Sequence, residues 1–216
     1  MSFYRVMRFF VVGYVRVVYR VRVIGREHAP SGPYVIAPTH RSMLDIPLVG
    51  AITTRRIRFM GKQSLFRVPV LGSVFTALGG YAVARDGSDF GPVRESLKML
   101  AAGEPVVVYP EGTRQHGPEI APLQPGAVYL ALKANVPILP VGIAGAEETF
   151  RHPTGRFWGF GRIVVVVGEP IPPPARGSSV VKRALVDDLA ADLRVTLQRL
   201  RDEAYRIRDG APGVKP

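Results

Sequence analysis

One histidine in this sequence has a carboxylate at a spacing suited to proton transfer. His40 precedes Asp45 by five residues, in the stretch Thr-His-Arg-Ser-Met-Leu-Asp. On one continuous helix the two side chains would point about 140° apart. If His40 instead lies in a loop and Asp45 in the first turn of a helix, the carboxylate can accept a hydrogen bond from one imidazole nitrogen. The other nitrogen would then take a proton from a substrate hydroxyl, as in a serine-protease triad whose serine is replaced by the substrate.

The same segment also permits a purely structural explanation. Ser42 and Asp45 have the spacing of a helix capping box, and His40 would then be an ordinary loop residue. Taken alone, the spacing does not choose between these two interpretations.

A second polar group follows the valine-rich run 105–109. In Glu111-Gly112-Thr113-Arg114, the glycine permits close backbone approach, the threonine offers a hydroxyl and the arginine can bind phosphate with two nitrogens. The group predicts an anion site, and its alternative is a surface turn with an ordinary salt-bridging arginine. Lys62 and Arg85 are further cations near predicted strand ends, and either could equally be solvated.

Composition restricts the chemistry and the partners. The 216 residues carry a formal net charge of +12, which suits nucleic acid, anionic lipid headgroups or phosphate-bearing substrates. The absence of cysteine excludes disulfides, a thiol nucleophile and cysteine-based zinc sites.

The first 24 residues predict an interfacial helix followed by a lead-in strand. Their longest uncharged run, 9–15, is far shorter than the roughly 20 apolar residues that span a bilayer. On a helix, Arg5, Arg8 and Arg16 share one sector, which would place them at lipid headgroups, with aromatic residues such as Phe9 and Phe10 at the acyl boundary. The alternative is a helix packed on the protein's own core with solvated arginines.

Strand-like and helix-like segments alternate along the rest of the chain. The predicted strands are 19–23, 34–37, 57–60, 81–84, 105–109, 138–143 and 162–167, the first two being adjacent. The predicted helices are 43–52, 64–78 with an interruption at Pro69, 89–102, 128–134 and 179–206. The alternation predicts an α/β fold, with a mostly parallel or mixed central sheet covered by helices on both faces. Ligands bind at the carboxyl ends of such strands, so His40 and the 111–114 group are expected to line one crevice.

Four segments, in order, closely resemble the four motifs of the glycerolipid acyltransferases typified by bacterial 1-acylglycerol-3-phosphate acyltransferase. They are 39–45, 61–66 continuing through Gly79-Gly80 to Arg85, 109–114 and 136–141. The resemblance extends over about 21–171 and implies an acyltransferase domain at 25–208, preceded by the membrane-docking segment 1–24 and followed by a disordered tail at 209–216.

The resemblance also implies a role for each matching residue. His40 would be the base and Asp45 its partner, while Glu111, Gly112, Thr113 and Arg114 would form the glycerol-phosphate site, and Lys62 and Arg85 would face the phosphate. The implied reaction moves a fatty acyl group from acyl-CoA or acyl-carrier protein to the sn-2 hydroxyl of 1-acylglycerol 3-phosphate, giving phosphatidate. This reaction requires no metal and no cofactor. The resemblance also implies a peripheral or monotopic protein on the anionic cytoplasmic face of the cell membrane.

Three departures from the family pattern leave the acceptor open. Thr39 replaces the commonest asparagine, Gln63-Ser64 replaces a stretch that is often acidic, and Ala84 stands where aspartate is frequent. Two other classes remain as rivals. One is a catalytically silent lipid-binding protein, and the other is a basic nucleic-acid-binding protein, for which the sequence carries no recognition motif, so no nucleic acid is expected as a partner.

Overall fold

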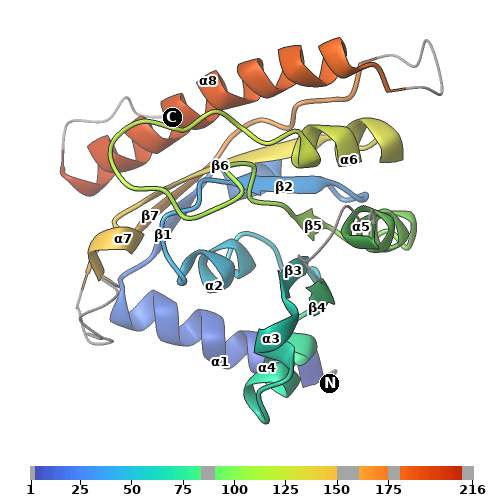
Figure 1. Cartoon of the computed structure of the whole chain (residues 1–216). Helices are drawn as coiled ribbons and strands as arrows, with labels where there is room; N and C mark the ends of the chain where they lie inside the picture. The colour runs from blue at the N-terminus through green and yellow to red at the C-terminus, as the bar shows by residue number, and fades with distance from the viewer. Residues whose placement is uncertain (1–2, 84–90, 150–160, 175–180, 211–216) are drawn as a thin grey trace.

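A mixed β-sheet forms the centre of the computed structural model, which describes residues 3–83, 91–149, 161–174 and 181–210 (Figure 1). Within those residues the sheet has seven strands in the order β1-β7-β6-β2-β5-β3-β4. The strands are β1 Arg22–Ile24, β2 Val35–Pro38, β3 Arg58–Lys62, β4 Gly80–Val83, β5 Val106–Val107, β6 Ile138–Ala144 and β7 Val164–Val167. The β6–β7 pair is antiparallel and the other neighbouring pairs are parallel.

Helices cover both faces of the sheet, as the sequence predicts. They are α1 Phe3–Val18, α2 Asp45–Gly50, α3 Gln63–Phe66, α4 Leu71–Ala77, α5 Gly91–Ala101, α6 Gly126–Ala134, α7 Ala146–Thr149 and α8 Arg183–Arg208, with a short 3-10 helix at Arg26–His28. In Figure 1, α1 and α2 lie below the sheet, and α6 and α8 lie above it. The helix expected at 64–78 is divided into α3 and α4 around Pro69, because proline interrupts helical hydrogen bonding.

The central strand β2 shows how the sequence builds two cores. Tyr34 and Ile36 pack into the cluster shared with α1 and α2, whereas Val35 and Ala37 pack into the cluster shared with α6 and α8. Successive side chains of a strand point to opposite faces, so an uninterrupted apolar run is what a strand buried on both faces requires.

The first strand differs from its prediction in both position and partner. It begins at Arg22 because Tyr19 still donates its N–H to the Val15 carbonyl and Arg20 adopts a φ of 44°, which turns the chain before the strand starts. The strand pairs with β7, not with β2 as expected.

Helix α1 packs on α2 through the buried Val12 and Val15, and its buried Tyr4 donates a hydrogen bond to the Arg55 carbonyl beyond α2. Helix α1 also exposes a set of large apolar side chains, the α1 apolar face, made of Phe3, Val6, Phe9, Phe10, Tyr14 and Val17. In the part of the chain that the structure describes, no helix is both long enough and apolar enough to cross a bilayer. The last helix ends at Arg208, and 211–216 of the predicted tail lie outside the described residues.

Arg8 departs from the expectation that it contacts lipid headgroups. Its guanidinium donates hydrogen bonds to the carbonyl oxygens of Gly50 and Thr53, at 3.2 and 2.6 Å. The carbonyls at the end of a helix lack intrahelical partners, and Arg8 supplies donors at and just beyond the end of α2. Arg5 and Arg16 are exposed.

Candidate active site

His40 lies in the loop between β2 and α2, and the structure joins it to Asp45. The imidazole Nδ1 is 2.8 Å from Asp45 Oδ2. Asp45 begins α2 and is fully buried. The same carboxylate oxygen accepts the backbone N–H groups of Arg41 and Ser42, at 2.7 and 2.9 Å. Asp45 therefore organises the turn like a capping residue and also contacts the histidine, so both interpretations of the spacing describe part of its role.

These contacts fix the direction of the hydrogen bond. Because Asp45 Oδ2 already accepts two backbone N–H groups, it acts as an acceptor, and His40 Nδ1 must be the donor. His40 Nε2 is then the nitrogen that can accept a proton. Burial raises the pKa of Asp45 above its ordinary value, although the hydrogen bonds from His40, Ser42 and Arg41 favour the carboxylate.

Thr39, one of the three departures from the family pattern, has a structural role here. Its N–H donates to the Val141 carbonyl, and its hydroxyl accepts the N–H of Ile143 at 3.1 Å. The threonine therefore ties the start of the His40 loop to β6.

Glu111 does not occupy the phosphate-facing place expected for it. Its side chain is fully buried, and its Oε1 accepts the backbone N–H of His40 at 2.8 Å. Its Oε2 lies 3.4 Å from the Arg41 guanidinium, which is also buried and which donates to the carbonyls of Gly117 and Glu119. Because the carboxylate is enclosed by the protein and faces the His40 backbone and Arg41, Glu111 supports the His40 loop and does not reach the cavity.

The remaining residues of the second group do face the cavity beside His40. Gly112, Thr113 and Arg114 are exposed and line it together with the imidazole. Gly112 has a φ of 74°, which favours glycine, and a Cβ there would lie 3.0 Å from Gln124. The structure records no hydrogen bond or ion pair for the Arg114 guanidinium among the described residues, so it is available to an anion. Lys62 is the last residue of β3. Its side chain and the whole of Arg85 lie outside the part of the chain that the structure describes.

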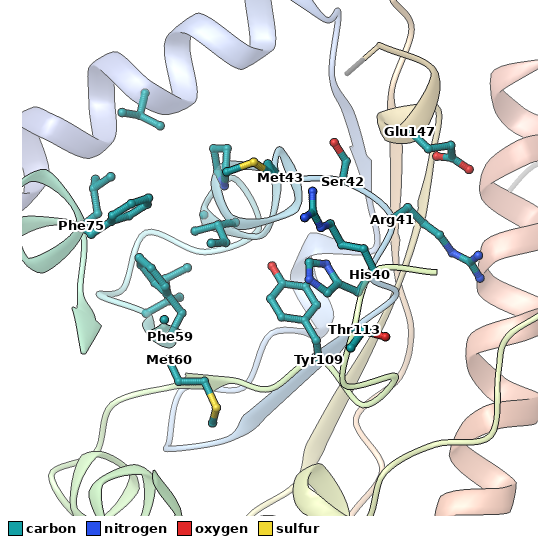
Figure 2. Close-up of a pocket in the computed structure, with 18 of the residues that line it drawn as sticks. His40, Arg41, Ser42, Met43, Phe59, Met60, Phe75, Tyr109, Thr113 and Glu147 are labelled. Carbon is teal, nitrogen blue, oxygen red and sulfur yellow. The ribbon is translucent and has the colours of Figure 1, made fainter. Parts of the chain in front are cut away.

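The cavity has a volume of about 1300 Å³ and combines a polar end with an apolar branch. His40, Thr113 and Arg114 line the polar end, where His116, Glu147 and Glu148 also contribute. The apolar branch extends between α1, α2, α4 and β3, and its lining includes Val11, Val12, Ile46, Phe59, Phe66, Phe75 and Leu78. Figure 2 shows Phe59 and Phe75 on the far side of the cavity from Arg41 and Glu147, with His40 and Tyr109 between them. Such a cavity can hold a long apolar chain with a polar group beside His40.

Sequence reasoning missed three contributors to this site. Arg41 pairs with Glu111, Tyr109 stacks on His40, and His116 lines the polar end of the cavity. Arg41 and Tyr109 belong to the motifs that resemble the acyltransferase family, and this membership was the available signal. No pattern in the sequence indicates where these side chains point.

A family model gives the class of protein to which this fold and site correspond. The chain belongs to the Acyltransferase family, whose model matches residues 20–144. It is 30% identical over 156 residues to the 1-acyl-sn-glycerol-3-phosphate acyltransferase of Bacillus subtilis (strain 168), covering 70% of this chain and 73% of that protein. It is 33% identical over 182 residues to the human 1-acyl-sn-glycerol-3-phosphate acyltransferase beta, covering 79% of this chain and 62% of that protein.

The fold has a counterpart among solved structures. The crystal structure of the 1-acyl-sn-glycerophosphate (LPA) acyltransferase PlsC from Thermotoga maritima superposes with a TM-score of 0.71 at 24% identity, covering 96% of this chain and 83% of that one. The predicted α/β fold and the predicted family are both confirmed.

Proposed function

We propose that this acyltransferase moves a fatty acyl group from a thioester donor to the sn-2 hydroxyl of 1-acylglycerol 3-phosphate, producing phosphatidate. The 2.8 Å contact between His40 and Asp45, at the polar end of a cavity that also has an apolar branch, is the observation that carries the proposal. The names of the relatives support the acceptor, because each is a 1-acyl-sn-glycerol-3-phosphate acyltransferase.

The proposed reaction uses His40 as a general base. His40 Nε2 takes the proton of the acceptor hydroxyl as its oxygen attacks the thioester carbonyl carbon, and Asp45 stabilises the imidazolium that forms. The carbon–sulfur bond then breaks, and the departing thiolate takes the proton from the imidazolium. The step consumes acyl-CoA or acyl-carrier protein as co-substrate and calls on no cofactor.

The two parts of the cavity suit the two parts of the substrates. An acyl chain fits the apolar branch, where burial of its methylene groups stabilises binding. The phosphate fits beside Arg114, whose planar guanidinium can bind two phosphate oxygens at once. Lys62 and Arg85 are proposed as additional phosphate contacts.

The exposed α1 apolar face supports docking on a membrane. Phe9 and Phe10 are 71% and 65% exposed, and Arg5 and Arg16 are exposed on the same helix. Aromatic side chains beside cationic ones suit the interface of an anionic membrane. We place the protein peripherally on the cytoplasmic face, where its water-soluble donor is available.

A panel of acceptors tests the proposed substrate. Purified protein with acyl-CoA and lipid vesicles should release free thiol in the presence of lysophosphatidate, and much more slowly with an uncharged lysolipid or glycerol 3-phosphate. The same measurement with acyl-carrier protein as donor identifies the carrier. Equal rates with charged and uncharged lysolipids would contradict the phosphate requirement.

Arg114→Gln should weaken binding of the phosphate-bearing acceptor. Hydrogen bonds to charged groups contribute about 1.5–3 kcal/mol, so the KM for lysophosphatidate should rise about 10- to 100-fold. The matched control is Arg199→Gln, which removes an exposed arginine of α8 that does not line the cavity. Steady-state kinetics at varied acceptor concentration measure the effect, and an unchanged KM would remove Arg114 from the phosphate site.

Replacing Phe9 and Phe10 together with serine should reduce membrane binding. Burial of one large apolar side chain contributes about 1.5–3 kcal/mol, so the vesicle partition coefficient should fall at least about tenfold. Val195→Ser, which changes a 71% exposed valine of α8, is the control and should leave partitioning unchanged. If sedimentation with anionic vesicles gave equal partitioning for both variants, α1 would not be the docking element.

A further inference from the structure

The aromatic ring of Tyr109 lies against the imidazole of His40. The two ring centroids are 4.0 Å apart and the ring planes differ by 24°, so the rings are stacked (Figure 2). His40 follows β2 and Tyr109 follows β5, which are parallel neighbours in the sheet. The stack therefore joins the loops at the carboxyl ends of two adjacent strands, and both residues line the same cavity.

The hydroxyl of Tyr109 does not explain the presence of this residue. Its oxygen is buried and has no hydrogen-bond partner among the described residues. A buried hydroxyl without a partner opposes folding, so phenylalanine would fit the position at no cost to hydrogen bonding. Burial, with the nearby Asp45 carboxylate as the second cause, raises the pKa of Tyr109 well above its ordinary value, and the ring stays a neutral phenol.

We propose that the aromatic face of Tyr109 positions the His40 imidazole and stabilises the imidazolium formed during proton transfer. Asp45 contacts His40 in the plane of the imidazole, at Nδ1, whereas Tyr109 contacts its face. The electron-rich face of an aromatic ring attracts a cation, and the attraction is larger where water is excluded. The stack also restricts rotation of the imidazole, which keeps Nδ1 directed toward Asp45. Tyr109 is thus a positioning residue, and its catalytic consequence rests on the proposed function.

Other charged groups also act on His40, and the test must hold them constant. Asp45 contacts the imidazole, and Glu111, paired with Arg41, contacts the backbone of His40. The other titratable or charged residues that line the same cavity, among those described, are Tyr4, Arg8, Arg114, His116, Glu147 and Glu148. Substitutions at Tyr109 leave every one of these residues in place, so a difference between an aromatic and a non-aromatic variant reports on the ring.

The test compares Tyr109→Phe, which keeps the ring, with Tyr109→Leu and Tyr109→Met, which remove it. NMR titration of the imidazole C–H resonances, assigned with His40→Ala, follows protonation of His40 without any substrate. We expect the midpoint to fall by about one pH unit in the leucine and methionine variants and to stay within about 0.3 unit in the phenylalanine variant. Two non-aromatic variants are used so that poor folding of one does not remove the measurement.

Turnover supplies the second readout. The non-aromatic variants should lose about 5- to 30-fold in kcat with little change in KM, and Tyr109→Phe should retain the wild-type kcat. An unchanged midpoint in both non-aromatic variants would overturn the proposal, as would an equal loss in Tyr109→Phe, since the hydroxyl would then be the active group. If the wild-type protein makes no phosphatidate, the proposed function fails, while the substrate-free titration still decides the role of Tyr109.

Discussion

Replacing His40 with alanine is expected to lower kcat by about 10²- to 10⁴-fold, the usual contribution of a well-placed general base. The KM values should change little, because the imidazole acts on the acceptor proton in the transition state. Rates of thiol release at saturating donor and acceptor measure this loss. His28→Ala is the matched control, because His28 contacts Val167 and Glu169 near β1 and does not line the cavity. Near wild-type turnover in His40→Ala would contradict the mechanism.

Asp45→Asn tests the role of the negative charge beside His40 while the imidazole stays in place. The N–H groups of Arg41 and Ser42 require an acceptor, so the amide oxygen should take the place of Oδ2 and the geometry should be kept. What is lost is the negative charge beside the imidazolium. At about 4 Å and an effective dielectric constant near 20, that charge contributes about 4 kcal/mol, or about 10³-fold in kcat.

The same variant should lose the pH dependence of stability that Asp45 contributes. The folded-state pKa of Asp45 is raised, so the stabilisation from its protonated form exists at low pH and is lost as the pH rises through that raised pKa. Asparagine does not titrate, but its amide NH2 takes the place of the buried Oδ1, which has no hydrogen-bond partner among the described residues, so a pH-independent loss of about 1–3 kcal/mol is also expected. Denaturant unfolding over a range of pH measures both changes, with Asp188→Asn, an exposed residue of α8, as control. An unchanged pH dependence in Asp45→Asn would contradict the raised pKa of Asp45.

Glu111→Leu is expected to cost about 3–5 kcal/mol of unfolding free energy, because it leaves the buried Arg41 guanidinium without its carboxylate. Adding Arg41→Met should recover part of the loss, since an apolar pair can replace a buried ion pair. Glu119→Leu, at an exposed position, should have little effect. Denaturant unfolding measures the free energy of unfolding of the wild type, the two single variants and the double variant.

Kinetics separate this supporting role from phosphate binding. In Glu111→Leu the kcat of the folded fraction should fall, because His40 loses a backbone hydrogen bond, while the KM for lysophosphatidate stays unchanged. A rise in KM like that expected for Arg114→Gln would return Glu111 to the phosphate site.

Residue patterns in the sequence were sufficient to predict most of the fold and the pairing of His40 with Asp45. Apolar runs mark β2 and β6 because both faces of these strands are buried, and the turn after Pro38 places His40 in a loop. The five-residue separation from Asp45 is consistent with a hydrogen bond only in that arrangement, and the structure contains it.

The expectations for Glu111 and Arg8 differ from the structure for one physical reason, the direction of a side chain in three dimensions. Glu111 follows the same strand as Arg114, yet its side chain turns inward to Arg41 and the His40 backbone. Arg8 shares a helical sector with Arg5 and Arg16, yet the carbonyls near the end of α2 lie within its reach. The partners of both residues are more than 40 positions away in sequence, where periodicity carries no information.

Mass spectrometry of the product tests the central proposal most directly. Wild-type protein supplied with lysophosphatidate and isotope-labelled acyl-CoA, or labelled acyl-carrier protein, should form phosphatidate with the label in the sn-2 ester, and His40→Ala should form almost none. Labelled phosphatidate at equal rates from both proteins would contradict general-base catalysis by His40. Absence of labelled phosphatidate from the wild type with either donor would contradict the proposed reaction itself.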